Sequence, residues 1–294
     1  MTRDTRTHIH NGGDDAPSAT LDRSASGVEC ARQGGTPPVA RDILVLTATL
    51  TPQPDSFQLV RRDPIIRLQD YVTSLQFYLT KVPKVFDRLV FIENSGSDLR
   101  PLKDVATALG QNDRVVFVGL NCNDFPSKWG RGYGEFLLLD NGLAQVPGLR
   151  SHDRIWKVSG RLRVLNIERL VRHRPLKFDL YCDLRDVPLI GEAFGGNKWM
   201  DTRCWAATYA FFNSVFRGQC ENMKHHDVGG SAEKYLYRLV RGLPDSHMIV
   251  PRFRIQPNIA GYSGYANADY QSVGYRAKNM VRAISRRLVP WVWL

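Results

Sequence analysis

The amino-acid sequence predicts an α/β fold built on a doubly wound sheet. Three apolar runs, at residues 43–50, 88–92 and 114–120, have the composition of strands buried on both faces. Between these runs, apolar residues recur at three- and four-residue steps, as they do in amphipathic helices. A β-α-β-α-β order of this kind forms a parallel sheet with right-handed crossovers, which binds its ligand beyond the carboxyl ends of the strands.

Composition sets the class of the protein. A chain of 294 residues, 43% of them apolar, is long enough for a large core. Its five cysteines are scattered singly, which favours reduced thiols in the cytoplasm over a disulfide framework. No apolar run reaches the roughly 18 to 20 residues of a membrane span, and the N-terminus lacks the apolar segment of a signal peptide. We therefore expect a chain that is neither integral to a membrane nor exported by that route.

The net charge of +11 favours anionic partners such as phosphates or anionic lipid. The basic and aromatic residues of the chain do not form an RNP, helix-turn-helix or zinc-finger pattern, so no nucleic-acid partner is expected. Residues 1–40 are rich in Gly, Ser, Thr, Asp and Pro and predict a disordered leader. His8 and His10 in this leader have no further metal ligand nearby, which favours a solvated tail.

The N-terminal half alternates strands and helices. Asp63 and Pro64 open a helical pattern that continues to residue 79. The strand at 88–92 is followed by a polar loop and then by a helix at 101–109, for which Gly110 is the expected stop. The third strand, at 114–120, completes the half-domain.

A glycine-rich segment follows the third strand. Gly130, Gly132 and Gly134 precede a helix expected from Phe136 to about Val146. Glycines before a helix N-terminus can bring backbone amides close to an anion, although a structural turn would explain them equally well. Gly142 within the helix indicates close packing or a position facing a site.

The fourth strand occupies residues 153–161 and ends in cations and a glycine. Further along, the patterns predict a short helix within 162–171, a fifth strand at 178–186 and a late strand at 249–259. Residues 201–208 are typical of a sixth strand or of the start of a helix reaching Phe216. Ser231 is the expected N-cap of a helix whose apolar residues lie on one face.

Residues 276–294 form a basic tail without a single acidic residue, and Trp291 and Trp293 lie near its end. This composition is typical of an anchor at an anionic membrane surface. A C-terminal helix that packs its tryptophans on the protein's own core is the alternative. The predicted organisation is thus a leader at 1–40, one domain at 41–275 and a tail at 276–294.

From residue 42 to about 275, the order of these parts resembles bacterial polysaccharide and lipopolysaccharide glycosyltransferases of the GT-A fold. The resemblance implies that the ends of the first two strands and the glycine-rich segment hold a nucleotide-sugar donor. The residues at those positions are Thr47, Ala48, Glu93, Asn94, Gly132 and Glu135.

At the end of the fourth strand the chain departs from that family. The family usually has Asp-x-Asp there to hold a divalent cation, and this chain has Lys157, Gly160 and Arg161. Fixed cations can stabilise the charge of a departing diphosphate as a metal does, and Gly160 permits a bend that lets both cations converge. Alternatively, Arg161 is an ordinary surface cation and Lys157 pairs with an acid at the edge of the core.

Carboxylates elsewhere supply the remaining candidates. Asp183 is expected beside the donor, and together with Asp186 it could hold Mg²⁺ or Mn²⁺ or pair with Arg185; no other cofactor is expected. Glu233 resembles the acidic residue that opens the corresponding helix in the family, and is the candidate base for the acceptor hydroxyl; its place at a helix N-terminus favours the ionised carboxylate. Asp227 is the second choice. Glu233 could equally serve only the helix dipole.

The sequence therefore predicts a cytoplasmic, peripheral-membrane glycosyltransferase. It would move a sugar from a nucleotide donor to a glycan or lipid-linked acceptor in cell-surface polysaccharide synthesis, without an Asp-x-Asp metal site. The competing hypothesis is a non-catalytic domain that binds an anionic glycan or phosphate-rich partner. Nucleotidyl transfer would predict a glycine-rich, lysine-bearing loop after the first strand, where the chain has residues 49–53, Thr-Leu-Thr-Pro-Gln.

Overall fold

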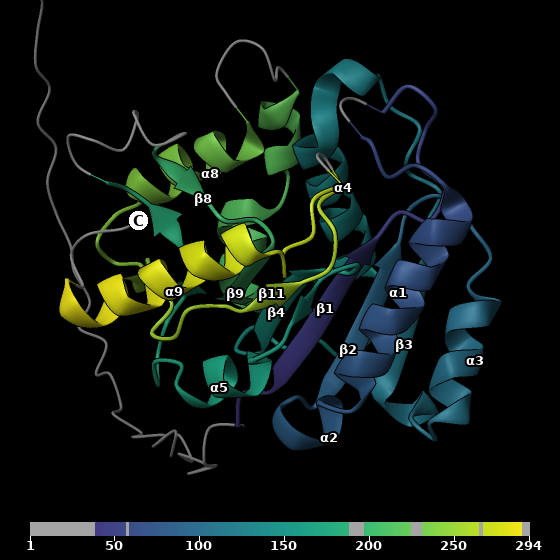
Figure 1. The fold of residues 1–294 in the computed structure, drawn as a ribbon, viewed down its shortest axis with the longest axis horizontal. Helices are drawn as coiled ribbons and strands as arrows, with labels where there is room; N and C mark the ends of the chain where they lie inside the picture. The colour runs from purple at the N-terminus through teal and green to yellow at the C-terminus, as the bar shows by residue number, and fades with distance from the viewer. Residues whose placement is uncertain (1–38, 57–58, 188–196, 225–230, 265–266, 290–294) are drawn as a thin grey trace, which may run out of the picture. The chain divides into compact units, whose positions relative to one another are not determined.

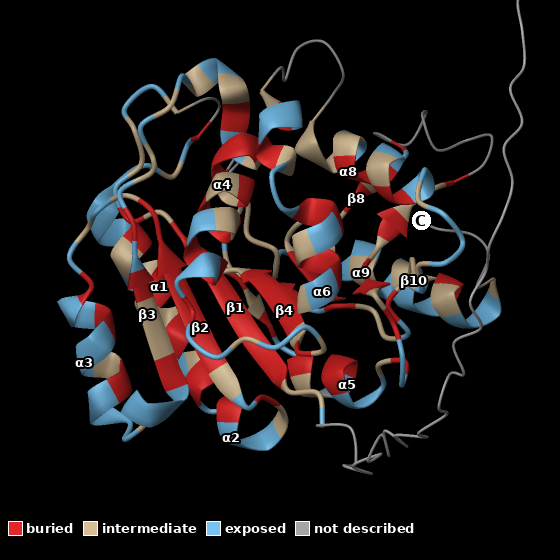
Figure 2. Ribbon diagram, turned by 180° about the vertical axis from the view of Figure 1, so that it is seen from behind, coloured by how far each residue is buried: buried red, intermediate tan, exposed pale blue. Residues whose placement is uncertain are grey.

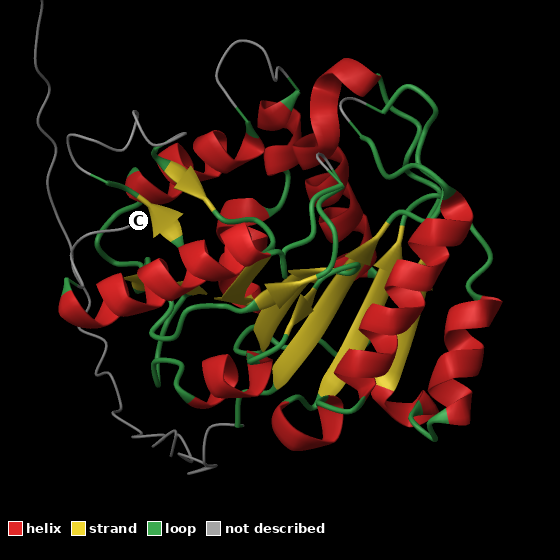
Figure 3. Cartoon of the chain, viewed as in Figure 1, coloured by secondary structure: helices red, strands yellow, loops and turns green. Residues whose placement is uncertain are grey.

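A seven-stranded mixed sheet forms the centre of the fold (Figures 1 and 3). The computed structural model describes residues 39–56, 59–187, 197–224, 231–264 and 267–289. In spatial order the strands are β10 (Ile249–Val250), β6 (Leu180–Tyr181), β9 (Cys204–Thr208), β4 (Arg154–Ser159), β1 (Asp42–Ala48), β2 (Arg88–Glu93) and β3 (Val115–Gly119).

The sheet is doubly wound about β1. This strand pairs in parallel with β2 on one side and β4 on the other, and β3 continues the parallel set beyond β2. Only β9 runs against its two neighbours, β4 and β6, among the pairings of this sheet. The predicted fold class, a doubly wound mixed α/β sheet flanked by helices, is confirmed.

Helices cover both faces, because successive residues of a strand point to opposite sides. Leu44 and Leu46 of β1 belong to the apolar cluster on one face, and Ile43 and Val45 to the cluster on the other. Figure 2 shows the central strands buried between these layers. The first layer holds α1 (Pro64–Leu79), α2 (Val82–Val85), α3 (Arg100–Ala108) and α5 (Ile167–Arg172); the second holds α4 (Gly130–Ala144), α6 (Tyr209–Phe211), η4 (Phe212–Phe216) and α8 (Ala232–Arg241).

The remaining elements are short, apart from one long C-terminal helix. Two small antiparallel ladders pair β5 with β11 and β7 with β8. The bounds are β5 (Arg163–Val164), β7 (Leu184–Arg185), β8 (Trp199–Met200), β11 (Ile259–Ala260), η1 (Asn112–Arg114), η2 (Ser127–Trp129), η5 (Gln219–Met223) and α9 (Val273–Leu288). Among the described residues, no helix is both long and apolar enough to cross a bilayer.

The predicted helix ends in the N-terminal half are confirmed. The Asp63 carboxylate caps α1 by accepting hydrogen bonds from the amides of Ile65 at 2.8 Å and Ile66 at 3.3 Å. After α3, Gly110 adopts φ +62°, the left-handed conformation that commonly follows a helix C-terminus. The helix expected after Ser231 is α8, but the Ser231 side chain makes no capping hydrogen bond.

Two predicted strands are much shorter than expected. Within 178–186, only Leu180–Tyr181 joins the main sheet, and the chain then turns into β7. Of the 249–259 segment, only the two ends pair, as β10 and β11 in different sheets. Pro251 and Pro257 explain the interruption, since proline has no amide hydrogen to donate to a ladder. Residues 201–208 combine both alternatives, because β9 ends at Thr208 and α6 starts at the next residue.

The prediction that the helix of the glycine-rich segment begins at Phe136 was wrong. The helix α4 begins at Gly130, so the glycines of the glycine-rich segment lie inside it. A Cβ atom on Gly132 would lie 2.1 Å from the Cβ of Ala232 in α8, and one on Gly142 would lie 2.4 Å from the Ile92 side chain of β2. Close packing of α4 against its neighbours therefore outweighs the low helix propensity of glycine.

We expect Gly132→Ala to destabilise the fold by about 1–3 kcal/mol, because the added methyl group overpacks the α4–α8 contact. Adding Ala232→Gly should restore most of this loss by removing the opposing methyl group. Urea denaturation of the three variants measures the effect.

Gly274→Ala is the matched control, since Gly274 lies in α9 with no atom within 4 Å of an added Cβ. It should be neutral or slightly stabilising. Equal losses in Gly132→Ala with and without Ala232→Gly would contradict the packing role of Gly132.

Candidate functional site

A cavity of about 550 Å³ opens beyond the carboxyl ends of β1 and β4. The chain leaves β1 toward β2 and β3 on one side and returns to β4 on the other, so the strand order reverses between these two strands. Open α/β sheets bind ligands at such a switch point. The volume lies within the range of pockets that hold small molecules and cofactors.

The base of the cavity is formed where β1 and β4 end side by side. The Gly160 amide donates a hydrogen bond to the Thr47 carbonyl at 2.8 Å. A Cβ atom at residue 160 would lie 2.6 Å from that carbonyl oxygen, so the two chains can approach this closely only because residue 160 is a glycine. Thr47, Ala48, Gly160 and Arg161 all line the cavity.

A buried ion pair lies behind this base. Lys157 of β4 is fully buried, and its ammonium group contacts the Glu135 carboxylate of α4. The same ammonium donates to the Thr202 carbonyl at 2.6 Å and to the Ser159 hydroxyl at 3.3 Å. Lys157 therefore uses its three donors within the protein and holds Glu135, as the second of the sequence-based interpretations proposed.

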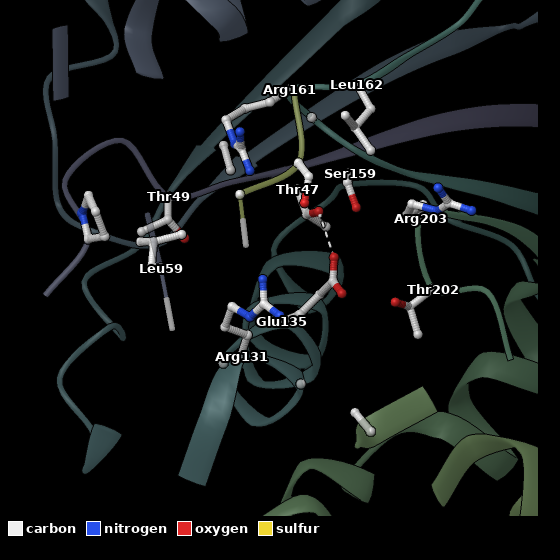
Figure 4. A pocket seen from close by; sticks show the side chains of 18 of the residues that line it. Thr47, Thr49, Leu59, Arg131, Glu135, Ser159, Arg161, Leu162, Thr202 and Arg203 are labelled. Atoms are coloured by element: carbon white, nitrogen blue, oxygen red, sulfur yellow. Dashed lines mark hydrogen bonds between the residues drawn. The ribbon is translucent and has the colours of Figure 1, made fainter. Parts of the chain in front are cut away.

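Glu135 itself lines the cavity, with 24% of its side chain exposed. Its carboxylate also accepts a hydrogen bond from the Thr47 hydroxyl at 3.1 Å, which Figure 4 shows as a dashed line. With Lys157 on one side and Thr47 on the other, the carboxylate is held in one orientation at the cavity surface.

The two polar residues that end β2 differ in their position. Glu93 is fully buried, and its carboxylate accepts hydrogen bonds from the amides of Leu50 at 2.8 Å and Ser95 at 3.0 Å. It thus ties the loop after β1 to the loop after β2, behind the cavity surface. Asn94 lines the cavity and accepts a hydrogen bond from the Thr49 hydroxyl at 2.7 Å.

Cations predominate on the cavity walls. In Figure 4 the guanidinium groups of Arg131 and Arg161 extend into the same space from different elements. Arg161 is oriented by Asp70 at 3.7 Å and by the Tyr262 carbonyl at 3.4 Å. The charged residues of the lining are Arg67, Arg131, Arg161, Arg203, Lys278 and Arg282 against Glu135, Asp201 and Glu233.

Carboxylates gather toward the side formed by β9 and α8. Glu233, in the first turn of α8, accepts a hydrogen bond from the Thr202 hydroxyl at 3.4 Å. Asp201 is bound at both oxygens by Arg203, at 2.9 and 2.6 Å. Burial alone would favour the neutral acid, but the adjacent Arg203 guanidinium holds the pKa of Asp201 below its ordinary value, so this carboxylate stays ionised.

The structure brings most of the predicted site residues to one cavity. Those that line it are Thr47, Ala48, Asn94, Gly132, Glu135, Gly160, Arg161 and Glu233. Glu93 and Lys157 lie behind its surface, and Asp183 lies in a smaller neighbouring pocket. Asp227 falls outside the described residues.

The sequence reasoning missed several cavity residues. Arg67 belongs to α1, where a helical pattern identifies its apolar positions but not which cation points inward. Lys278 and Arg282 belong to α9, the first part of the tail that was assigned to a membrane. Sequence reasoning could have found the segment of Asp201, Thr202 and Arg203, because charged residues directly before an apolar strand mark the edge of the sheet.

The carboxylates for which a metal was one of two alternatives, Asp183 and Asp186, are bound by arginine and tyrosine side chains instead. Asp183 is bound by Arg286 at 3.1 and 2.6 Å, and Asp186 accepts a hydrogen bond from Tyr237 and lies 3.5 Å from Arg241. Within the described ranges, no group of three or more His, Cys, Asp or Glu side chains is placed to hold a metal ion. These residues therefore do not fit the Asp-x-Asp type of cation site.

We expect Lys157→Met to lower the free energy of unfolding by about 3 kcal/mol, because it leaves the Glu135 carboxylate without its buried partner. Lys157→Met/Glu135→Gln should lose less than the single variant, since no unpaired charge then remains. Urea denaturation at pH 7 measures both.

Lys81→Met is the control, since Lys81 pairs with Glu168 at 3.1 Å with both side chains partly exposed. It should cost at most about 1 kcal/mol. If Lys157→Met costs no more than Lys81→Met, the buried ion pair does not support the site.

Comparison with known proteins gives similarity of structure only. No family model matches the chain, and no curated protein matches it. Among solved structures, 4-diphosphocytidyl-2C-methyl-D-erythritol synthase is 9% identical over 83% of this chain and 98% of its own, with a TM-score of 0.39. The galactosyltransferase LgtC, in complex with donor and acceptor sugar analogues, is 11% identical over 66% and 69%, with a TM-score of 0.37. The inositol-1-phosphate CTP transferase of T. maritima is 13% identical over 71% and 84%, with a TM-score of 0.42. Similarities at these TM-scores assign neither a reaction nor a substrate.

Proposed function

We propose that this protein is a glycosyltransferase that takes its sugar from a nucleotide donor. The observation that carries the proposal is that Arg131 and Arg161 extend into one cavity at the β1–β4 switch point, which the oriented carboxylates of Glu135 and Glu233 also line. Guanidinium groups bind the oxygens of a diphosphate, and carboxylates accept hydrogen bonds from sugar hydroxyls. A nucleotide sugar carries both kinds of group.

On the donor side, Arg161 and Arg131 would contact the diphosphate. Breaking the bond between the sugar and the diphosphate builds negative charge on the leaving group, and fixed guanidinium groups stabilise that charge. Glu135, held by Lys157 and Thr47, would accept hydrogen bonds from donor sugar hydroxyls. Thr47, Ala48, Asn94 and Gly160 would contact the donor from the base of the cavity.

Glu233 would act as the base. The acceptor hydroxyl oxygen forms a bond to the anomeric carbon of the donor while the bond from that carbon to the diphosphate oxygen breaks. The bonding pair leaves with the diphosphate, and the hydroxyl proton passes to the Glu233 carboxylate. Thr202 orients this carboxylate, which lies in the first turn of α8.

Two competing functions have less support. Nucleotidyl transfer needs a lysine-bearing glycine loop after β1, and the residues of that loop that line the cavity are Thr49, Pro52, Gln53 and Ser56. A non-catalytic domain would need no carboxylate oriented toward the cavity, whereas both Glu135 and Glu233 are hydrogen-bonded in such positions.

We expect Glu233→Gln to lower transfer by about 10²–10⁴-fold while donor affinity stays within a few-fold, since the variant loses the base but keeps the shape of the cavity. The measurement is release of nucleoside diphosphate from a panel of UDP-, GDP- and TDP-linked sugars, first without and then with candidate acceptors, in buffer containing EDTA.

Glu221→Gln is the matched control, because Glu221 is 59% exposed and does not line the cavity. It should behave as the parent. Parent-like turnover in Glu233→Gln would exclude Glu233 as the base, and the absence of turnover by the parent with every donor would favour the non-catalytic alternative.

We further propose that α9 attaches the enzyme to an anionic membrane surface. Five apolar side chains of this helix are half or more exposed, namely Val273, Met280, Val281, Ile284 and Leu288. The helix also carries the exposed Arg276 and Arg287 and has no acidic residue. An apolar stripe flanked by cations is the composition of a helix that lies in the membrane interface. The tryptophans of the tail fall outside the described residues.

Vesicle sedimentation of the full chain tests this attachment. Binding to phosphatidylcholine vesicles that contain phosphatidylserine should fall several-fold in Met280→Gln/Ile284→Gln and weaken with added salt. Leu176→Gln changes an apolar side chain that is 97% exposed but lies outside α9, and this variant should bind as the parent does. Equal binding by all three proteins would exclude α9 as the attachment surface.

A further inference from the structure

Three aromatic side chains gather where the cavity meets a smaller pocket of about 50 Å³. Trp199 comes from β8, Tyr270 from the segment before α9 and Tyr275 from α9 itself, and all three line both spaces. Each is partly exposed, so each presents part of its ring to the open space. We call these three residues the aromatic platform. Because the smaller pocket has no room for a whole sugar or base, a ligand of the platform would lie on the cavity side.

Neighbouring groups hold the rings of the platform in place. The rings of Tyr270 and Tyr275 pack edge to face, with their centroids 5.1 Å apart and their planes at 75°. The Arg203 guanidinium lies 5.1 Å from the centroid of Tyr270, and the Arg185 guanidinium lies 5.8 Å from the centroid of Trp199. A surface that is already ordered loses little side-chain entropy when it binds a ligand.

The platform borders the candidate base. Strand β8 packs against α8, whose first turn carries Glu233 (Figure 1). Asp201 and Arg203 line the same two spaces as the platform, and Thr202 between them donates a hydrogen bond to the Glu233 carboxylate at 3.4 Å. One short segment therefore connects the aromatic rings to the carboxylate that would take the proton of the acceptor hydroxyl.

Charged groups at the edges of the platform can bind hydroxyls. Arg203 binds both oxygens of the ionised Asp201 carboxylate, and each oxygen can accept a second hydrogen bond. The Lys278 ammonium, which also lines the cavity, lies 5.8 Å from the ring centroid of Tyr275. A hydrocarbon chain on these rings would take the charges out of water without replacing their hydrogen bonds, which costs free energy. The platform thus favours a ligand with an apolar face and polar edges.

We propose that the aromatic platform binds a sugar ring of the acceptor, so that the acceptor is a saccharide. The inference rests on the proposed glycosyl transfer, because that function makes Glu233 the base. A pyranose carries C–H groups on its faces and hydroxyls around its edge. The negative face of an aromatic ring attracts the positively polarised C–H groups, and the neighbouring charged groups bind the hydroxyls.

Saturation-transfer NMR on the full chain measures this binding without any donor. The probes are the methyl glycosides of glucose, galactose, mannose and N-acetylglucosamine, with the acyclic polyol sorbitol for comparison. Saturation of the aromatic protons should pass to the ring C–H protons of at least one glycoside but not to sorbitol, which has hydroxyls but no rigid apolar face. Tyr275→Leu should weaken the affinity for that glycoside about fivefold by removing one aromatic contact, and Tyr275→Phe should bind as the parent does.

Tyr209→Leu is the matched control, because Tyr209 is partly buried, as Tyr275 is, and does not line the cavity. It should bind glycosides as the parent does. Trp199→Leu is the second variant if Tyr275→Leu does not fold. The inference is overturned by transfer to none of the glycosides, by equal transfer to sorbitol, by undiminished affinity in the platform variants, or by Tyr275-dependent binding of uridine or guanosine in place of the glycosides.

The catalytic test compares release of nucleoside diphosphate with and without acceptor in the same protein. At a subsaturating concentration, the glycoside that binds should stimulate release by the parent. A long-chain alcohol or a long-chain lipid phosphate without a sugar, each in detergent, should not. The stimulation should fall about fivefold in Tyr275→Leu and persist in Tyr275→Phe and Tyr209→Leu.

The outcomes separate this inference from the proposed function. If donors turn over but a lipid alcohol or lipid phosphate stimulates release as well as the glycosides do, the platform inference fails and glycosyl transfer stands. If no donor turns over while Tyr275-dependent glycoside binding remains, the proposed function fails and the platform stands as the site of a saccharide-binding protein.

Discussion

The contact between Lys157 and Glu135 is the interaction on which the site depends. An ammonium group buried in the central strand β4 requires an anionic partner, because an unpaired charge in a protein interior is very costly. The partner comes from α4, so the ion pair fixes that helix over the ends of β1 and β4. Glu135 is then presented to the cavity with Thr47 as its second contact. Removing Lys157 would therefore change the position of α4 as well as the charge of the site.

The glycines of α4 make this placement possible. Gly132 lets α4 contact α8 at Ala232, and Gly142 lets it contact Ile92 of β2. Since Glu233 follows directly after Ala232, the same close contact sets how far the candidate base lies from the donor side. The packing of α4 against α8 therefore helps to set the position of the candidate base.

The order of the main strands and helices could be predicted from the sequence, because buried parallel strands read as apolar runs and helices repeat at 3.6 residues. The ends of β1 and β4, both assigned to the donor site from the sequence, adjoin at Thr47 and Gly160. The start of α4 could not be predicted, since glycines that permit close packing have the same local signal as glycines of a loop. Nor does the pattern around Lys157 reveal that Glu135 from another element would bind it.

Side-chain partners from distant elements explain the other differences. Asp183 was expected beside the donor, but Arg286 lies 103 residues along the chain and binds it in the smaller pocket. The composition of α9 indicated either membrane binding or a helix packed on the core. Its residues Lys278 and Arg282 line the cavity, while five of its apolar side chains are exposed. Helical periodicity separates the faces of a helix but does not state which face meets a site.

The central claim is that the cavity between the ends of β1 and β4 holds the diphosphate of a nucleotide sugar. Isothermal titration calorimetry with UDP-, GDP- and TDP-linked sugars, in EDTA, tests it most directly when the parent is compared with Arg161→Ala. The account predicts selective binding of one nucleotide class by the parent and an affinity at least tenfold weaker in the variant. Binding that is equally tight in both proteins, or that no nucleotide sugar shows, would contradict it.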